Sequence, residues 1–396
     1  MRFGLERIRK LVVVLGMPQH RFTSIHVVGT NGKSSVAEIT AALLEAHGRR
    51  SGAYLSPHDR RWSERIQVGG SEIEPERFAA AVERVAEAVP AVERTLDDDD
   101  SVTQFEADTA AAFVALASAG VEVGVIEAGL GGRLDATNVL LSRATVLTSI
   151  GLEHTAWLGD TELEIAAEKL AVLGEHTTLV LGPVSSEVAE LARATANERH
   201  SELVTVRDLG PAIELPTPVP FVRRNFAVAL AAAETVLGDL DLERVRDVAA
   251  AIRLPGRAQL LAGHPPVILD AAHNPAAASA LAEALPELVA GRPVTACVAV
   301  LADKDAEGIV SALGPAIAGL VATELPAPRL ASAARPGAKA LATGELASFA
   351  RAAGIRSVVE EADPSAAIAL GRSLAREAGG VLVVCGSHYL LGYCEP

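Results

Sequence analysis

The chain has 396 residues and a formal net charge of −15, and 49% of its residues are hydrophobic. This length exceeds what one ordinary hydrophobic core supports, so we expect two domains. The negative charge argues against a nucleic-acid or membrane partner held by bulk electrostatics. No apolar run is long enough to span a bilayer, and the opening residues MRFGLERIRK contain no secretory signal. We therefore expect a cytoplasmic protein.

Short apolar runs alternate with alanine-rich stretches of helical spacing, which predicts an α/β protein with parallel sheets covered on both faces. The predicted strands are residues 25–28, 121–126, 144–150, 178–181, 267–269, 294–300 and 381–384. The clearest helical stretches are residues 36–46, 107–119 and 226–237. Pro255 and Gly256 then interrupt the chain before a second strand–helix series. We predict a first domain over residues 1–253 and a second over residues 254–396.

The segment HVVGTNGKSS, residues 26–35, places a loop of small residues between an apolar run and a helical stretch. Only Thr30 and Asn31 separate its glycines, whereas the common phosphate-binding loop has four residues there. A loop at a helix N-terminus still offers N–H groups and a favourable dipole to an anion, and Lys33 adds a positive charge. The alternative is a plain turn with an exposed lysine. The context favours phosphate binding by Gly29, Thr30, Asn31, Gly32, Lys33, Ser34 and Ser35.

Further along the chain, polar side chains follow two predicted strands. Glu127, in VEVGVIEAGLGGRLDATN, ends an apolar run, where an acid is costly unless it serves a site. It suits a magnesium ligand or a water-orienting carboxylate, although a carboxylate capped by local N–H groups is a serious alternative. His154 lies in a strand-to-helix loop, where α/β sheets place their ligands, but an isolated histidine is usually structural. Lys169 and Glu168, in a predicted helix, are interpreted on their own as solvated charges.

No specific catalytic or binding role is predicted for three other features. The cysteines Cys297, Cys385 and Cys394 are not spaced like a zinc site, and buried thiols are expected near the apolar runs. Residues 97–100 form an acidic run that is interpreted as a solvated loop. A local basic cluster of Arg60, Arg61 and Arg65 leaves room for an anionic substrate despite the net charge.

The segments GTNGKSS, YLSPHDRRWSERI, QFEADTAAAF, EAGLGGRLDATN, SIGLEHTAWLGDTELEIAAEKLAVL, LPGRAQLL, LDAAHNP, ADKD and GSHYLLG occur in this order. Together they resemble the folylpolyglutamate synthase/dihydrofolate synthase family of the Mur ligase superfamily. The segments GLGGRLDATN and SIGLEHT…EK are the most diagnostic. The resemblance implies an N-terminal P-loop-type Mur ligase ATPase domain and a smaller Rossmann-like C-terminal domain that ligates glutamate.

The implied reaction is ATP-dependent ligation of L-glutamate to a pterin-linked carboxylate. In it, ATP phosphorylates the carboxylate, the glutamate amine attacks the acyl phosphate, and phosphate leaves. The acceptor is dihydropteroate, a reduced folate or both. The resemblance implies ATP and two Mg²⁺ ions as cofactors, and we expect a monomer that binds neither nucleic acid nor membrane.

The family's functional positions are transferred residue by residue. Metal binding is implied for Ser56, Glu127, His154 and, when its amine carries a carbamate, Lys169. ATP binding is implied for the loop and for Asn225, Arg257 and Asp270. Catalytic roles are implied for Lys33, Lys169 and His273, the last of these near the glutamate or the intermediate.

Several positions depart from the family pattern without removing an implied metal ligand, among them Val222, where glutamine is frequent, and Ala271 in DAAHN, where glycine is common. Ser34 stands where the family usually has glycine, and Glu153 stands where aspartate is common. Asp59 follows SPH where leucine is usual, in a region associated with the pterin, so the pterin preference stays open.

Two alternatives are weighed against the folate ligase. Another Mur-type ligase, for example of cell-wall synthesis, usually carries a nucleotide-sugar domain before the ATP loop, and only 28 residues precede Gly29. An ATP-binding protein without catalysis is disfavoured because every implied catalytic or metal-binding side chain is present. These are Lys33, Ser56, Glu127, His154, Lys169 and His273.

Overall fold

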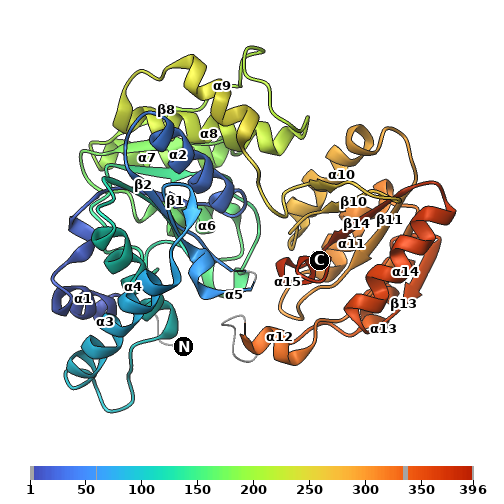
Figure 1. Cartoon of the computed structure of the whole chain (residues 1–396), viewed down its shortest axis with the longest axis horizontal. Helices are drawn as coiled ribbons and strands as arrows, with labels where there is room; N and C mark the ends of the chain where they lie inside the picture. The colour runs from blue at the N-terminus through green and yellow to red at the C-terminus, as the bar shows by residue number, and fades with distance from the viewer. Residues whose placement is uncertain (1–3, 59, 333–337, 395–396) are drawn as a thin grey trace. The chain divides into compact units, whose positions relative to one another are not determined.

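In the computed structural model of the chain, residues 4–58, 60–332 and 338–394 are described, and Asp59 lies outside them. The chain forms two compact units, coloured blue to yellow and yellow to red in Figure 1. The first unit comprises residues 1–216 and 223–252, and the second comprises residues 217–222 and 253–396.

The first unit is built on a sheet with strand order β4-β3-β2-β5-β1-β6-β7-β8. Its strands are β1 (Thr23–Val28), β2 (Ser51–Tyr54), β3 (Ile66–Val68), β4 (Ser71–Glu72), β5 (Val123–Glu127), β6 (Ala144–Leu147), β7 (Thr178–Leu181) and β8 (Glu202–Thr205). The neighbouring pairs β2–β5, β5–β1, β1–β6, β6–β7 and β7–β8 are parallel. The pairs β2–β3 and β3–β4 are antiparallel, so the prediction of a parallel sheet is wrong at this edge. Strand β1 lies between β5 and β6, with Val27 opposite Glu127 on one side and Val146 on the other. The carboxyl ends of these three strands therefore meet at one edge.

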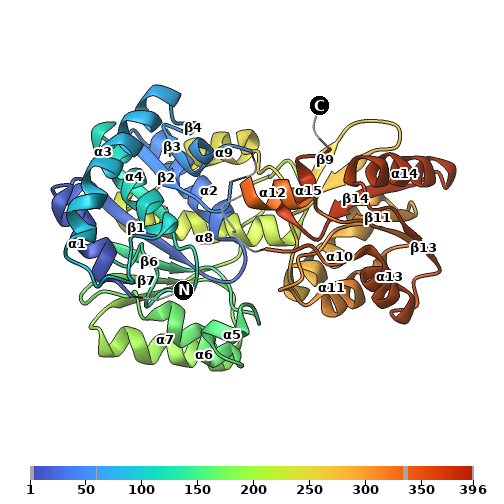
Figure 2. The same cartoon turned by 90° about the horizontal axis from the view of Figure 1, so that it is seen from below.

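Two apolar clusters connect some helices of the first unit to this sheet. The helices of this unit follow in chain order. They are α1 (Glu6–Val14), η1 (Pro18–His20), α2 (Lys33–Ala46), η2 (Trp62–Arg65), α3 (Pro75–Glu93), α4 (Gln104–Ser118), α5 (Thr155–Leu158), α6 (Glu162–Leu170), α7 (Ser186–Glu198), α8 (Pro220–Leu237) and α9 (Leu242–Ala251). One cluster joins α1, α3 and α4 to Tyr54 and Ile126, and the other joins α6 and α7 to Leu147 and Leu179. Figure 2 shows the two groups of helices.

The second unit is built on a sheet with strand order β13-β12-β11-β14-β10-β9. Its strands are β9 (Gln259–Leu261), β10 (Val267–Leu269), β11 (Val294–Val298), β12 (Gly319–Ala322), β13 (Ser357–Glu360) and β14 (Val381–Cys385). Only the β9–β10 pair among these described strands is antiparallel. Its helices are α10 (Pro275–Val289), α11 (Ala306–Leu313), η3 (Gly314–Ala316), α12 (Ala327–Ser332), α13 (Thr343–Ala352), α14 (Pro364–Glu377) and α15 (His388–Leu391).

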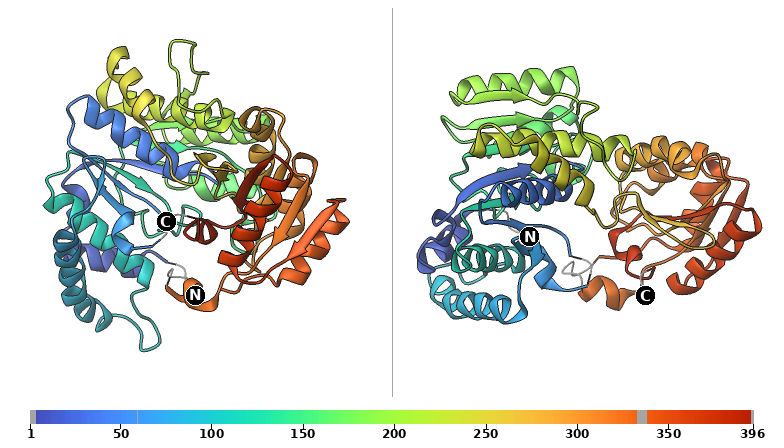
Figure 3. Two further views of the ribbon diagram at one scale, coloured as in Figure 1. Left: turned by 45° about the vertical axis from the view of Figure 1, so that its right-hand side comes forward. Right: turned by 45° about the horizontal axis from the view of Figure 1, so that its top comes forward.

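Side chains along β11 alternate between two cores of this unit. Ala296 and Val298 pack with α10, α11 and α13, whereas Cys297 packs with α14 and α15. This period of two is what a strand covered by helices on both faces requires. Figures 2 and 3 show the sheet between its two helical layers. Both layers are those of the predicted α/β architecture.

The structure shows the surroundings of the cysteines, of the basic cluster and of the acidic run at residues 97–100. All three cysteines are buried and free, as predicted for thiols in a core. Within the basic cluster, Arg65 is buried and pairs with Asp108 at 2.7 Å. Arg60 and Arg61 are exposed, and Arg61 pairs with Glu72 at 2.8 Å. The prediction of a solvated acidic run is wrong at Asp100, because its carboxylate forms a 3.0 Å ion pair with the buried Arg7. Across the described ranges, no helix is both long and apolar enough to cross a membrane.

Candidate active site

The loop between β1 and α2 needs glycine at both of its glycine positions. Gly29 and Gly32 have φ of +151° and +84°. A Cβ on Gly29 would overlap Thr148 Oγ1, and a Cβ on Gly32 would lie 2.5 Å from Asn225 Oδ1. Gly32 is the N-cap of α2 and provides no side-chain cap. The first N–H groups of α2 therefore remain available to an anion.

Asn225 comes from α8, far along the chain, and its side chain packs directly against Gly32. The structure thus brings this sequence-predicted ATP residue to the loop. Lys33 lies in the first turn of α2, and its Nζ donates a 3.0 Å hydrogen bond to the carbonyl of Thr30. The ammonium group is held over the loop, where a phosphate would meet it.

Glu127 gathers two more of the predicted residues. Its side chain is 2% exposed at the end of β5. One carboxylate oxygen accepts a 3.1 Å hydrogen bond from Ser34 Oγ, and the other accepts a 3.0 Å bond from the backbone N–H of Ser56. The carboxylate is therefore fixed beside the phosphate loop, as the position at a strand end next to β1 predicts.

Lys169 is not the solvated charge that its helical position suggests. It is 4% exposed, and its Nζ donates a 2.8 Å hydrogen bond to the carbonyl of Gly29. Burial, reinforced by the nearby charge of Lys33, lowers the pKa of this amine to about 7, against the opposing effect of acids that include Glu153. Glu168 is not a solvated charge either, because its carboxylate forms a 3.0 Å ion pair with Arg133.

His154 lies in the left-handed region, with φ of +53°, immediately before α5. Its Nε2 is 3.4 Å from a carboxylate oxygen of Glu153. Glu153 also acts electrostatically on Lys169, so it connects two predicted residues although it is absent from the predicted set. Its position in a βα loop beside a predicted ligand was the available signal.

The residues around the loop fit a divalent cation held together with nucleotide phosphates. Ser35, in the first turn of α2, is 2% exposed, and its hydroxyl has no hydrogen-bond partner among the described residues. An orphaned buried hydroxyl at this position is what a phosphate or cation would satisfy. The carboxylate of Glu127 and the hydroxyl of Ser56 are oxygen donors of the kind that Mg²⁺ prefers. No group of three or more His, Cys, Asp or Glu side chains suited to a metal occurs in the described part of the chain.

The remaining predicted residues belong to the second unit and lie around the end of β10. Asp270 is 5% exposed and accepts hydrogen bonds from the N–H groups of Ala258, at 2.7 Å, and Ala272, at 2.8 Å. Burial raises the pKa of its carboxyl group, and the charge of Arg257 opposes that rise. His273 Nδ1 lies 2.9 Å from a backbone carbonyl, which fixes the ring.

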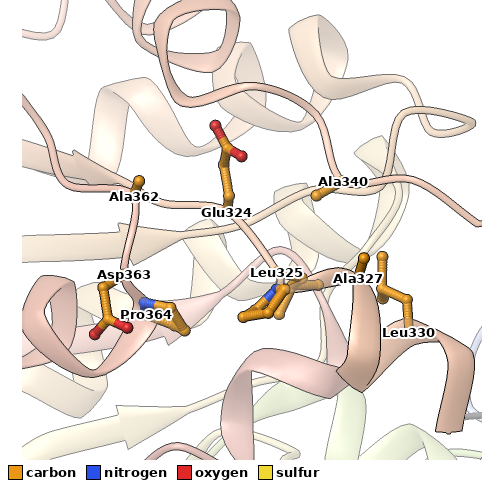
Figure 4. Close-up of a pocket in the computed structure, with 9 residues that line it drawn as sticks. Glu324, Leu325, Ala327, Leu330, Ala340, Ala362, Asp363 and Pro364 are labelled. Atoms are coloured by element: carbon orange, nitrogen blue, oxygen red, sulfur yellow. The ribbon is translucent and has the colours of Figure 1, made fainter.

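A hollow of about 440 Å³ lies in the second unit beyond the carboxyl ends of β12 and β13. Figure 4 shows Leu325, Ala327 and Leu330 on one side of it and Asp363 on the other. The Glu324 carboxylate points away from Leu325 and accepts a 3.1 Å hydrogen bond from the Thr343 N–H. None of the predicted site residues lines this hollow.

Comparison with known proteins places this arrangement in a family. Residues 256–388 match the model of the Mur ligase glutamate ligase domain. A dihydrofolate synthase/folylpolyglutamate synthase of Mycobacterium tuberculosis is 36% identical over 381 residues, covering 86% of this chain and 78% of that protein. The chain belongs to the dihydrofolate synthase/folylpolyglutamate synthase family. The resemblance inferred from the ordered sequence segments is thereby confirmed.

Solved structures of the family share the whole architecture. Mycobacterium tuberculosis folylpolyglutamate synthase complexed with ADP and AMPPCP has a TM-score of 0.91 at 33% identity, covering 99% of this chain and 95% of that chain. A bifunctional folylpolyglutamate synthase/dihydrofolate synthase with Mn, AMPPNP and L-glutamate bound has a TM-score of 0.84 at 29% identity, covering 100% and 94%. The predicted fold class, an ATPase domain followed by a smaller ligase domain, is confirmed.

Proposed function

We propose that this chain ligates L-glutamate to a folate or pteroate carboxylate at the expense of ATP. The Mycobacterium tuberculosis relative is named a dihydrofolate synthase/folylpolyglutamate synthase, and a solved family member holds Mn, AMPPNP and L-glutamate. The observation that carries the proposal is the uncapped N-terminus of α2, which meets the buried Glu127 and Lys169 in one place. Such a site is built for phosphate and its counter-charges.

The first step transfers the γ-phosphoryl group of ATP to an oxygen of the folate carboxylate. The bond from the γ-phosphorus to the bridging oxygen breaks, a new P–O bond forms, and ADP and an acyl phosphate result. The N–H groups of Gly32 and of the first turn of α2, together with the Lys33 ammonium, hold the negative phosphate oxygens. We assign Asn225, Arg257 and Asp270 to the nucleotide as well.

The second step forms the amide bond. The glutamate amine attacks the acyl carbon, a tetrahedral intermediate collapses, inorganic phosphate leaves, and the amine loses a proton. We assign His273 to this amine, because a hydrogen bond from Nδ1–H to the carbonyl orients the ring and makes Nε2 the nitrogen that can accept a proton. Holding two anionic substrates in reaction geometry is the main physical task of the site.

Divalent cations, two Mg²⁺ ions in our proposal, are assigned to Ser56, Glu127 and His154, where they would supply positive charge against the phosphates. We also propose that Lys169 carries a carbamate. Its amine adds CO₂, a N–C bond forms, a proton leaves to solvent, and the side chain becomes an anionic oxygen donor. The lowered pKa supports this, because only the neutral amine is nucleophilic.

Residues 1–253 are proposed as the ATPase domain and residues 254–396 as the glutamate-ligase domain; these bounds follow the two units closely, apart from residues 217–222 and 253, which belong to the second unit. The match of residues 256–388 to the glutamate ligase domain supports the second assignment. We further propose that the protein acts as a cytoplasmic monomer and needs neither nucleic acid nor a membrane.

Glutamate-dependent ADP release tests the proposal. The purified chain is offered ATP, Mg²⁺ and L-glutamate with dihydropteroate, tetrahydrofolate or a cell-wall nucleotide as acceptor. We expect release with one or both pterins and none with the nucleotide, and Lys33→Ala should abolish it. Activity with the cell-wall nucleotide alone would overturn the proposal in favour of another Mur-type ligase.

A further inference from the structure

The phosphate loop is bound along its length by the segment TSIG, residues 148–151, that follows β6. Thr148 Oγ1 donates to the carbonyl of Asn31 at 2.7 Å and lies 3.3 Å from the carbonyl of Val28. Ser149 Oγ also donates to the Asn31 carbonyl, at 3.0 Å, and accepts from the Asn31 N–H at 3.0 Å. Two hydroxyl groups thus hold one carbonyl of the loop.

The same segment holds the loop one residue earlier. The Thr30 N–H donates to the carbonyl of Ser149 at 2.8 Å. Thr30 Oγ1 donates to the Gly151 carbonyl at 3.1 Å and lies 3.2 Å from the Gly151 N–H. Thr30 and Thr148 are each 3% exposed, so these bonds are shielded from competing water.

The direction of one N–H group follows from this arrangement. In a trans peptide, the carbonyl of Asn31 and the N–H of Gly32 point in opposite directions within one rigid plane. Because Thr148 and Ser149 hold that carbonyl toward β6, the Gly32 N–H is turned away from β6. Gly32 is the N-cap of α2, so this N–H belongs to the group of donors available to an anion.

We propose that Thr148 and Ser149 are positioning residues for nucleotide binding, which fix the peptide plane between Asn31 and Gly32. The inference rests on the proposed function in that the loop binds a nucleotide. It adds that a neighbouring strand, rather than the loop's own sequence, sets the loop's donor geometry. The segment continues to Glu153 and His154, so the same backbone connects the phosphate loop to a proposed metal ligand.

Thr148→Val tests the proposal, because valine keeps the shape and removes both hydrogen bonds. The matched control is Thr145→Val, three residues earlier on β6, where the hydroxyl is fully buried and has no partner among the described residues. We expect ADP binding with Mn²⁺, measured by calorimetry, to weaken about tenfold in Thr148→Val and to stay unchanged in Thr145→Val. Thr148→Ser should restore affinity to within about twofold.

Kinetics separate positioning from general destabilisation. Thr148→Val should raise the KM for ATP while leaving the KM for glutamate unchanged, and Ser149→Ala should do the same to a smaller extent. Because Ser149 is only half-buried, its variant decides the question if Thr148→Val does not fold. A wild-type protein that fails to bind ADP would overturn the proposed function. Wild-type affinity for ADP in the folded variants would overturn this inference alone.

Discussion

At the scale of single residues, Glu127 is tightly constrained, because each of its oxygens has a donor, Ser34 Oγ or the Ser56 N–H. Glutamine would replace one oxygen by an NH₂ donor and remove the charge. We expect Glu127→Gln to raise the Mn²⁺ concentration needed for half-maximal AMPPNP binding about tenfold or more, measured by titration calorimetry. Ser34→Ala keeps the charge and should shift the midpoint less. An unchanged titration in Glu127→Gln would remove Glu127 from the metal site.

Lys169 makes a second prediction, about pH and stability. Its pKa is about 7 in the folded chain against 10.5 ordinarily, so the unfolded chain binds more protons between these values. The free energy of unfolding should therefore rise with pH in this window. Below pH 7 the folded chain carries the buried charge and its full destabilising effect, and above pH 10.5 that effect is absent because the amine is neutral in both states. Between pH 7 and 9 the rise amounts to about 2 kcal/mol.

Denaturant unfolding in CO₂-depleted buffer, without metal or nucleotide, measures this rise, because the free amine and not the proposed carbamate is the group that titrates. Lys169→Met removes the titrating amine and keeps an apolar stem, so the variant should lack this part of the rise between pH 7 and pH 9. Equal pH dependence in both proteins would mean that the folded amine keeps its proton throughout the range.

At the scale of elements, the contact of the GLGG turn with α6 places Lys169. A Cβ on Gly132 would lie 2.8 Å from the carbonyl oxygens of Glu168 and Lys169 and 3.0 Å from Lys169 Cα. Backbone atoms of a helix cannot move aside cheaply, so Gly132→Ala should reduce the free energy of unfolding by about 2 kcal/mol and lower turnover. Gly210→Ala is the control, since its Cβ would meet nothing within 4 Å. Wild-type stability and turnover in Gly132→Ala would show that the turn shifts freely.

The strands that the sequence predicts are buried, although not every buried strand was predicted. The runs at residues 178–181 and 267–269 coincide with β7 and β10, because a strand covered on both faces is continuously apolar. The edge strands β8 (Glu202–Thr205) and β13 (Ser357–Glu360) were missed, since partial exposure at an edge lets them begin and end with polar residues. The short strands β3, β4 and β9 were missed as well. The prediction also missed β2 (Ser51–Tyr54) and β12 (Gly319–Ala322), which are fully buried but are short and contain glycine.

The same distinction applies to the site. Lys33 and Glu127 are identifiable because their positions follow from a local strand or helix end. The contacts of Thr148 and Ser149 with the loop depend on β6 pairing with β1, although several elements separate them along the chain. The electrostatic effect of Glu153 on Lys169 likewise depends on the fold that brings these two residues near each other. Sequence pattern reports burial and local ends, whereas strand adjacency requires the folded sheet.

At the scale of the whole molecule, each unit has its own hydrophobic core, since none of the described apolar clusters draws residues from both units. We therefore expect two unfolding transitions in calorimetry. The chain has two tryptophans, Trp62 and Trp157, and both belong to the first unit. Tryptophan fluorescence should follow the first unit alone.

Ligand and core variants assign the two transitions. ADP with Mn²⁺ at about 100 times Kd should stabilise the fluorescence-detected transition by roughly 2.7 kcal/mol, and Lys33→Ala should abolish that gain. Leu116 and Leu281 are fully buried core residues of the first and second units. Leu281→Ala should cost about 3 kcal/mol in the transition that fluorescence does not detect, whereas Leu116→Ala should cost a similar amount in the one that it does. If either variant moved both transitions together, the two cores would unfold as one cooperative unit. The stability of the phosphate loop would then depend on the glutamate-ligase domain.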